Sequence, residues 1–358
     1  AYIRAMTEPA NPAIHTFHPD LTEANIARLV ATFYGRARED DLFGPIFNAQ
    51  VKDWDHHIAQ ISDFWSSMVL RTGRYNGRPM RPHLMLPLRP EHFDRWLLLF
   101  EKTAREIFDG DVAEAIDFLR YYARHMRELQ KPTRVGHAPG EISQYIYKPR
   151  GVVTVIAPWN FPLAILTGQV AAALVTGNTV VMKPAEQSSL VAQGLYEIFK
   201  QAGLPNSVLQ FLPGYGEEVG DYLVKHALTT TIAFTGSKAV GLLIAKNAAV
   251  VQPGQTHVKR CIIEMGGKNA LIIDNDADLD EAVDAVLYSA FGFSGQKCSA
   301  ASRVIVLQDV YEKFVERLVE AASSLQIHSA ENPLAYLGPV VDEEAHLRLL
   351  KTIDQAKQ

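Results

Sequence analysis

The hydrophobic pattern of this chain changes character along its length, and this change most constrains the fold. Between residues 21 and 108, apolar residues recur every three to four positions, the spacing of amphipathic helices, with Thr22 as a candidate N-cap. From Gly151 onward, short β-rich apolar runs alternate with helical segments, which is typical of buried parallel strands joined by crossover helices. The sequence therefore predicts an all-α part followed by an α/β part.

Individual elements can be predicted within both parts. In the first, helices are expected after Thr22, near Asp53 and from Pro90, the second with His57, Ile61, Phe64 and Met68 on one face. In the second, strands are expected at 152–157, 179–182, 208–212, 229–234, 258–263, 270–273 and 303–307, and helices at 279–290 and 310–325. A helix predicted over 112–126 can complete the first part or begin the second.

Composition narrows the classes of function. A length of 358 residues allows two or three domains. The net charge of −5 gives no electrostatic reason to expect nucleic acid or an anionic membrane as a partner, and no apolar run is long enough to span a bilayer. With two cysteines, no disulfide framework is implied, and a cytoplasmic location is the default. The chain opens on Ala1 and ends at Gln358 within a predicted helix, as expected for a fragment of a longer product.

One cysteine has the surroundings of a nucleophile. Cys298 follows Gly-Gln-Lys in a polar turn, whereas Cys261 lies inside an apolar run, as a small buried residue would. Glu264 comes just past that run, at a predicted strand end. Covalent oxidation of an aldehyde requires a thiol nucleophile and a carboxylate that activates water, so we predict these roles for Cys298 and Glu264. The alternative for Glu264 is a residue that only caps the strand end.

Motifs around this pair resemble the aldehyde dehydrogenase superfamily, from about Ala115 to Gln358. They are Ala157-Pro158-Trp159-Asn160-Phe161-Pro162, Lys183-Pro184-Ala185-Glu186, Phe234-Thr235-Gly236-Ser237, Glu264-Met265-Gly266-Gly267-Lys268 and the turn that holds Cys298. The resemblance implies a Rossmann-like NAD(P)-binding domain over 151–265 and a truncated catalytic domain over 266–358. It also implies an oligomer of identical subunits for the full-length dehydrogenase.

The same resemblance implies a role for each site residue. The Asn160 amide and the backbone N–H of Cys298 would stabilise the oxyanion of the aldehyde. NAD, or NADP, would be bound by Ile156, Pro158, Trp159, Lys183, Glu186, Gly236 and Ser237. Lys183 and Glu186 match positions that hold the adenosine ribose. Two simpler readings stay open: Asn160 as a turn residue, and Lys183 as a solvated strand end.

Further segments resemble the 1-pyrroline-5-carboxylate (glutamate semialdehyde) dehydrogenase branch of that superfamily. These are residues 117–122, 168–171, 213–220 and 291–293. The resemblance implies that glutamate semialdehyde is oxidised to glutamate in proline catabolism. Members of the family continue well past the position of Gln358, with segments that contact the nicotinamide ribose and the substrate carboxylate.

The helical part is similar to the group III truncated haemoglobins, on Phe33-Tyr34, Phe64-Trp65, His83-Leu84 and residues 42–47, 53–57, 73–77 and 92–97. The similarity implies a globin over 21–111, after an extension at 1–20 and before a shared helix and linker at 112–150. His83 would be the proximal ligand of the haem iron. Tyr34, His57 and Trp96 would line the distal side, where a diatomic molecule such as O2 binds. The alternative is that Tyr34 and Trp96 are core aromatics.

Three functions are therefore compatible with the sequence. The first is an NAD-dependent aldehyde dehydrogenase that carries an accessory globin. The second is a haem-based ligand-binding protein joined to an inactive dehydrogenase remnant. The third is a fragment in which neither site is complete. The presence of both Glu264 and Cys298 favours the first over the second.

Overall fold

The computed structural model describes residues 22–70, 72–75, 86–108, 110–329, 332 and 334–357. The chain divides into two compact units. The first comprises the described residues up to Val155 together with Phe161–Pro184 and Ser188–Pro213. The second comprises Ile156–Asn160, Ala185–Gln187 and the described residues from Gly214 onward.

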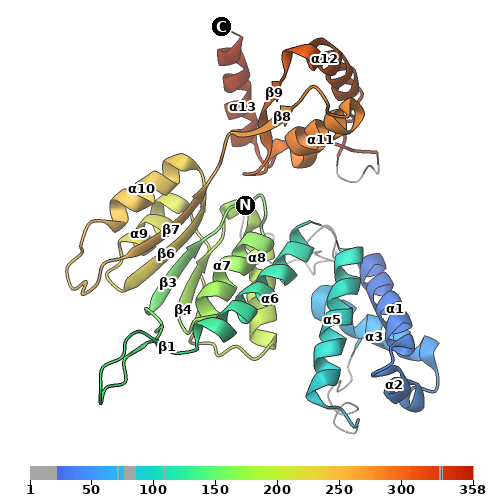
Figure 1. Cartoon of the computed structure of the whole chain (residues 1–358), viewed down its shortest axis with the longest axis vertical. Coiled ribbons are helices and arrows are strands. Elements are labelled where there is room, and N and C mark those ends of the chain that lie inside the picture. Colours follow the sequence, from blue (N-terminus) through green and yellow to red (C-terminus); the bar gives the residue numbers. More distant parts are fainter. Residues whose placement is uncertain are drawn as a thin grey trace, which may run out of the picture. The chain divides into compact units, whose positions relative to one another are not determined.

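The first unit opens with the predicted helices. They are α1 (Glu23–Glu39), α2 (Gly44–Gln50), α3 (Trp54–Leu70), α5 (Pro90–Ile107) and α6 (Asp111–Leu129). The Thr22 hydroxyl accepts a hydrogen bond from the Asn25 N–H at 3.1 Å, which confirms the predicted N-cap. Pro90 occupies the first turn of α5, where its missing N–H costs nothing. Helix α1 contacts both α3 and α5 (blue to teal in Figure 1).

An aromatic core holds these helices together. Phe33 and Phe43 are buried at its centre, next to Tyr34. Indole rings from α3 and α5 pack against them, those of Trp54, Trp65 and Trp96. Residues 76–85, which include the predicted iron ligand His83, lie outside the described part of the chain.

Helix α6 connects the helical region to the α/β region of the first unit. Its Val112 lies in a buried cluster with Leu29 of α1 and Ala104 of α5. The helix also packs along α7 (Ala164–Val175). One helix therefore packs both against the helical region and against α7.

A five-stranded sheet carries the α/β pattern. Its strands are β3 (Val152–Ile156), β4 (Thr179–Lys183), β5 (Leu209–Phe211), β6 (Thr229–Gly236) and β7 (Arg260–Met265), in the order β5-β4-β3-β6-β7. The pairs β4–β5 and β6–β7 are parallel. The connecting helices are α7, α8 (Ser189–Gln201), α9 (Asp221–Lys225) and α10 (Lys238–Ala248). The strand order reverses at β3, which is the topology of a doubly wound nucleotide-binding sheet.

Strand β7 corrects the expectation for Glu264. The predicted strand ended at residue 263, but pairing with β6 continues through Thr235 opposite Glu264 and Gly236 opposite Met265. Glu264 therefore lies within the strand and not past its end. The apolar run ends earlier than the strand because main-chain hydrogen bonds, which need no apolar side chain, carry the ladder two residues further.

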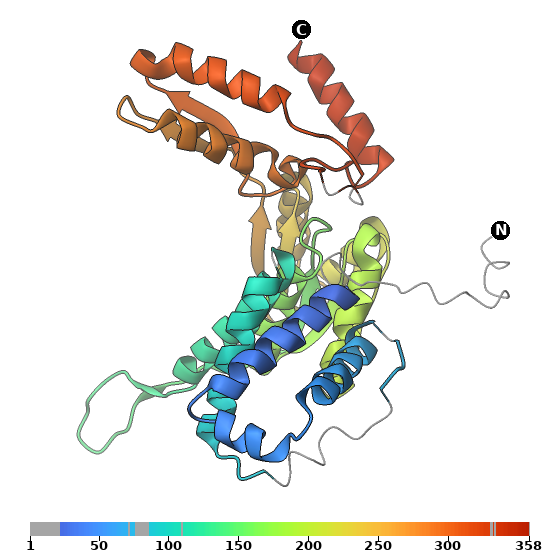
Figure 2. The same cartoon turned by 90° about the vertical axis from the view of Figure 1, so that its right-hand side faces the viewer.

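The rest of the second unit is built on a parallel pair, β8 (Asn269–Ile273) and β9 (Ala301–Val306). Helices α11 (Leu279–Phe291) and α12 (Gln308–Ser323) bury Val283, Val286 and Phe314 against Ile273 (orange in Figure 2). Helix α13 (Glu343–Ala356) follows. Strands β1 (Thr133–Arg134) and β2 (Gln144–Tyr145), in the first unit, form an antiparallel pair. Every described helix is too short or too polar to cross a membrane.

Candidate active site

The loop that follows β3 contacts the turn that carries the predicted nucleophile. Ile156, the last residue of β3, is buried against Ile232 and Phe234 of β6. Pro158, Trp159 and Asn160 follow and are half-buried. The Asn160 Nδ2 donates a hydrogen bond to the carbonyl of Gln296 at 2.6 Å. This bond anchors the predicted oxyanion donor two residues before Cys298.

That turn has an unusual backbone. After α11 ends at Phe291, Phe293 and Ser294 both have a φ of 56°, and Gly295 has a φ of 69°. Left-handed conformations cost side-chain-bearing residues free energy, so the surroundings must hold them in place. The N–H of Gln296 donates to the carbonyl of Phe293 at 3.1 Å, and the Ser294 hydroxyl donates to the carbonyl of Gly338 at 3.0 Å.

The predicted nucleophile lies at the end of this turn, and its side chain is exposed. Its own carbonyl accepts a hydrogen bond from the Asn269 Nδ2 at 2.9 Å, and the carbonyl of Ala300 accepts from the same amide at 3.2 Å. Sequence reasoning missed Asn269, and the available signal was an amide residue between Gly-Gly-Lys and an apolar strand. Asn269 and Asn160 thus hold the backbone on both sides of Cys298.

The second cysteine is placed differently. Cys261 lies on β7, half-buried against the core formed by Ile232 and Phe234. Burial raises the pKa of its thiol, an effect that the nearby Lys259 opposes. Because the thiolate is the reactive form, Cys261 is a poor nucleophile at neutral pH. Glu264, further along the same strand, is exposed.

The residues predicted to bind the nucleotide lie at strand ends or within three residues after them. Gly236 ends β6, and the Ser237 hydroxyl accepts from the Val240 N–H at 3.3 Å to cap α10. A helix N-terminus offers backbone N–H groups to an anion. A Cβ on Gly236 would come within 2.6 Å of the Phe234 ring, so any other residue there would require that ring to shift. Exposed Glu186 opens the short helix Glu186–Ser188, where its carboxylate can accept from ribose hydroxyls. These residues fit a dinucleotide.

Lys183, in the first unit, departs from the simpler expectation of a solvated strand end. It is the last residue of β4 and only 3% exposed. Its ammonium donates to the carbonyl of Pro184 at 2.9 Å. A buried ammonium needs such oxygen partners because desolvation penalises its charge.

Three of the four residues predicted to surround haem come together in the aromatic core. The rings of Tyr34 and His57 are 5.5 Å apart and perpendicular. Phe33 lies 5.0 Å from Tyr34 and 5.0 Å from Trp96. Burial raises the pKa of Tyr34 to about 12, so its hydroxyl stays a donor. Tyr34 and His57 thus each place a hydrogen-bonding group in this core. In the described part of the chain, no group of three or more His, Cys, Asp or Glu is arranged to hold a bare metal ion.

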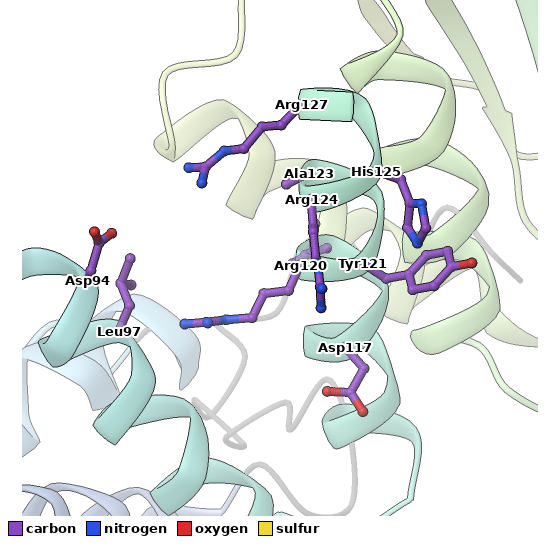
Figure 3. Close-up of a pocket in the computed structure, with 10 residues that line it drawn as sticks. Asp94, Leu97, Asp117, Arg120, Tyr121, Ala123, Arg124, His125 and Arg127 are labelled. Atoms are coloured by element: carbon purple, nitrogen blue, oxygen red, sulfur yellow. The ribbon is translucent and has the colours of Figure 1, made fainter. Parts of the chain in front are cut away.

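A cavity of about 830 Å³ lies between α5 and α6 in the first unit. Figure 3 shows the Arg120 side chain extending from α6 toward Asp94 and Leu97 of α5. Arg124 and Arg127 also line it. Sequence reasoning did not predict this cavity, and its described lining includes none of the residues predicted to bind either cofactor.

Comparison with known proteins places this geometry in context. Residues 93–358 match the aldehyde dehydrogenase family. The chain is 48% identical over 328 residues to 1-pyrroline-5-carboxylate dehydrogenase 1 of Halalkalibacterium halodurans, a match that covers 90% of this chain and 63% of that relative. Because it covers 90% of this chain, the match begins before residue 93. The chain spans about half to two thirds of the length of the curated relatives it matches.

Two solved structures share the fold. Proline utilization A from Bdellovibrio bacteriovorus, inactivated by N-propargylglycine, superposes with a TM-score of 0.67 at 55% identity, over 96% of this chain and 31% of that one. A 1-pyrroline-5-carboxylate dehydrogenase from Thermus with bound NAD superposes with a TM-score of 0.67 at 38% identity, over 93% of this chain and 54% of that one.

Proposed function

Because the chain belongs to the aldehyde dehydrogenase family, we propose that it contributes to the NAD-dependent oxidation of an aldehyde to a carboxylic acid through a thioester on Cys298. The observation that carries the proposal is the 2.6 Å hydrogen bond from Asn160 to the carbonyl of Gln296. It joins the predicted oxyanion donor to the backbone of the cysteine turn, although 136 residues separate the two in sequence.

The side chains have complementary roles in this reaction. The Cys298 thiolate attacks the carbonyl carbon, and the oxygen of the aldehyde becomes an oxyanion. An Asn amide carries two N–H groups, so the one that does not bind Gln296 can donate to this oxyanion, together with the backbone N–H of Cys298. Bound NAD, held by Glu186, Gly236 and Ser237, would supply the acceptor for the hydride of the aldehyde. Glu264 then takes a proton from the water that hydrolyses the thioester and releases the acid.

We propose glutamate semialdehyde, in equilibrium with 1-pyrroline-5-carboxylate, as the substrate and glutamate as the product. The support is that curated relatives at 45–50% identity are 1-pyrroline-5-carboxylate dehydrogenases. NAD is the proposed cofactor, since the Thermus neighbour has it bound and Glu186, Gly236 and Ser237 fit a dinucleotide. A cytoplasmic location and a full-length oligomer of identical subunits complete the proposal.

Substitution of the cysteines tests the assignment. We expect Cys298→Ser to abolish aldehyde-dependent formation of NADH, whereas Cys261→Ser retains it, because only Cys298 lies exposed in the turn that Asn160 contacts. NADH absorbance at 340 nm measures both. Loss of activity in Cys261→Ser together with retained activity in Cys298→Ser would show that Cys261, and not Cys298, is the nucleophile.

We also propose that the helical region over residues 21–111 is a truncated globin, with His83 on the haem iron and Tyr34, His57 and Trp96 on the distal side. The contact between Tyr34 and His57 in the aromatic core supports this, because it gathers two hydrogen-bond donors on facing helices. Bound haem would supply an iron site for a diatomic ligand such as O2. Under the alternative function, this haem site acts alone and the dehydrogenase part is inactive.

Spectroscopy separates these possibilities. The full chain, supplied with haem, should show a Soret band that shifts or collapses in His83→Ala. A Soret band without NADH formation would favour the haem protein with an inactive dehydrogenase. Absence of the band in the wild type would instead assign these helices to the dehydrogenase, in agreement with a curated match that begins before residue 93.

A further inference from the structure

One short segment of the second unit contacts two parts of the candidate site. The carbonyl of Gly338 accepts a hydrogen bond from the Ser294 hydroxyl at 3.0 Å, in the cysteine turn. Four residues later, the Asp342 Oδ2 accepts from the Gln187 Nε2 at 2.8 Å, in the loop that carries Glu186. We propose that residues 338–342 act as a strap that positions both the cysteine turn and the ribose-binding loop, an inference that rests on the function proposed above.

The Ser294 contact is placed where the backbone most needs support. Phe293 and Ser294 are consecutive left-handed residues with side chains, a conformation that persists only when surrounding contacts hold it. The hydroxyl of Ser294 joins this turn to the strap. Gln296, two residues on, presents the carbonyl that Asn160 binds. Loss of the strap contact would therefore loosen the backbone that orients Asn160 and Cys298.

The Asp342 carboxylate is held in place by a second hydrogen bond, to the start of α13. The Asp342 Oδ1 accepts from the Ala345 N–H at 2.8 Å and so caps α13, which leaves Oδ2 for Gln187. The bond from the Ala345 N–H, followed by that from Gln187, holds the pKa of Asp342 below its usual range. The carboxylate is therefore charged at neutral pH and can accept both bonds. Because Gln187 adjoins Glu186, this contact restrains the residue proposed to bind the ribose.

The two contacts predict separable effects. Ser294 should affect the reactive cysteine, and Gln187 should affect dinucleotide affinity, since each lies in a different loop. Both are positioning residues, because neither is placed on the substrate or the cofactor. The sequence contained no signal for either contact: 44 residues separate Ser294 from Gly338, and 155 separate Gln187 from Asp342.

Ser294→Ala tests the first contact. We expect backbone hydrogen exchange in peptide 291–300 to accelerate about fivefold, the effect of losing one typical hydrogen bond. The control is Ser323→Ala, which removes a hydroxyl that bonds within α12 and should leave this peptide unchanged. Ser294→Gly also loses the bond but relieves the left-handed strain, so its exchange should lie between that of wild type and Ser294→Ala. Unchanged exchange in Ser294→Ala would overturn this half of the proposal. If Ser294→Ala unfolds globally, Ser294→Gly decides: exchange faster than in the wild type supports the contact, and unchanged exchange refutes it.

Gln187→Leu tests the second contact. We expect the Kd for NAD, measured by titration calorimetry, to rise about threefold to fivefold, again the effect of one hydrogen bond. Gln210→Leu is the matched control, because Gln210 is an exposed glutamine whose amide bonds to Asn206 elsewhere. Equal affinity in wild type and Gln187→Leu would refute the contact's role. A wild-type protein that binds no NAD would refute the proposed function and with it the ribose half of the strap, whereas exchange in peptide 291–300 would still decide the cysteine half.

Discussion

Removal of the Asp111 carboxylate should destabilise the first turn of α7. Asp111 begins α6 and is only 8% exposed. Its two oxygens accept hydrogen bonds from the N–H groups of Leu163 at 3.0 Å and Ala164 at 2.6 Å. Leu163 itself provides no side-chain cap. A carboxylate 52 residues earlier in sequence therefore performs the capping role that Ser, Thr or Asp at the N-cap usually has.

The size of the effect follows from these contacts. A hydrogen bond to a charged group contributes roughly 1.5–3 kcal/mol, and loss of an N-cap costs about 0.5–2 kcal/mol. Since the two bonds share one carboxylate and are not additive, we expect Asp111→Ala to cost about 2–4 kcal/mol. Asp111→Asn retains one acceptor oxygen and should cost about half as much.

Hydrogen exchange of peptide 161–170 measures this locally. A loss of 2–4 kcal/mol corresponds to an acceleration of roughly 30-fold to 800-fold for the protected amides. Asp41→Ala, at an exposed aspartate between α1 and α2, is the control and should change exchange less than about threefold. Exchange in Asp111→Ala within threefold of the wild type would show that water replaces the carboxylate at no cost and that the capping argument is wrong.

Three further predictions concern other parts of the chain. Because burial raises the pKa of Tyr34 to about 12, its neutral hydroxyl stabilises the fold fully below pH 10, and roughly 2–3 kcal/mol of stability is lost between pH 10 and 12. Tyr34→Phe should remove this pH dependence, which alkaline unfolding followed by circular dichroism measures. Gly241→Val should destabilise the second unit by about 1–3 kcal/mol through overpacking, since even a Cβ would lie 2.9 Å from Ile263 and Met265. Its melting temperature should fall, and an unchanged value would contradict this prediction. Glu264→Gln should leave a burst of NADH followed by slow turnover, and an undiminished steady-state rate would exclude Glu264 from hydrolysis of the thioester.

Patterns among neighbouring residues were enough to predict most helices and strands. The three-to-four spacing predicted α1, α3 and α5, and Thr22 predicted the start of α1, because a helix is specified by neighbours within one or two turns. The alternation of short apolar runs and helices likewise predicted the α/β region. The polar turn around Cys298 and the apolar run around Cys261 predicted an exposed and a buried thiol, and the structure has Cys298 exposed and Cys261 half-buried.

Contacts between distant residues were decided by the tertiary structure. The strand that holds Glu264 ends where pairing with β6 ends, which no apolar pattern marks. The alternative reading of Lys183, a solvated strand end, is wrong because that strand end is buried. Asp111 reads as an ordinary acidic residue in a helix's first turn, but it caps a different helix. A hydrogen bond needs only two polar groups at the right distance, and the sequence holds many such groups. The fold selects which of them meet, because packing of the apolar faces sets where each strand and helix ends.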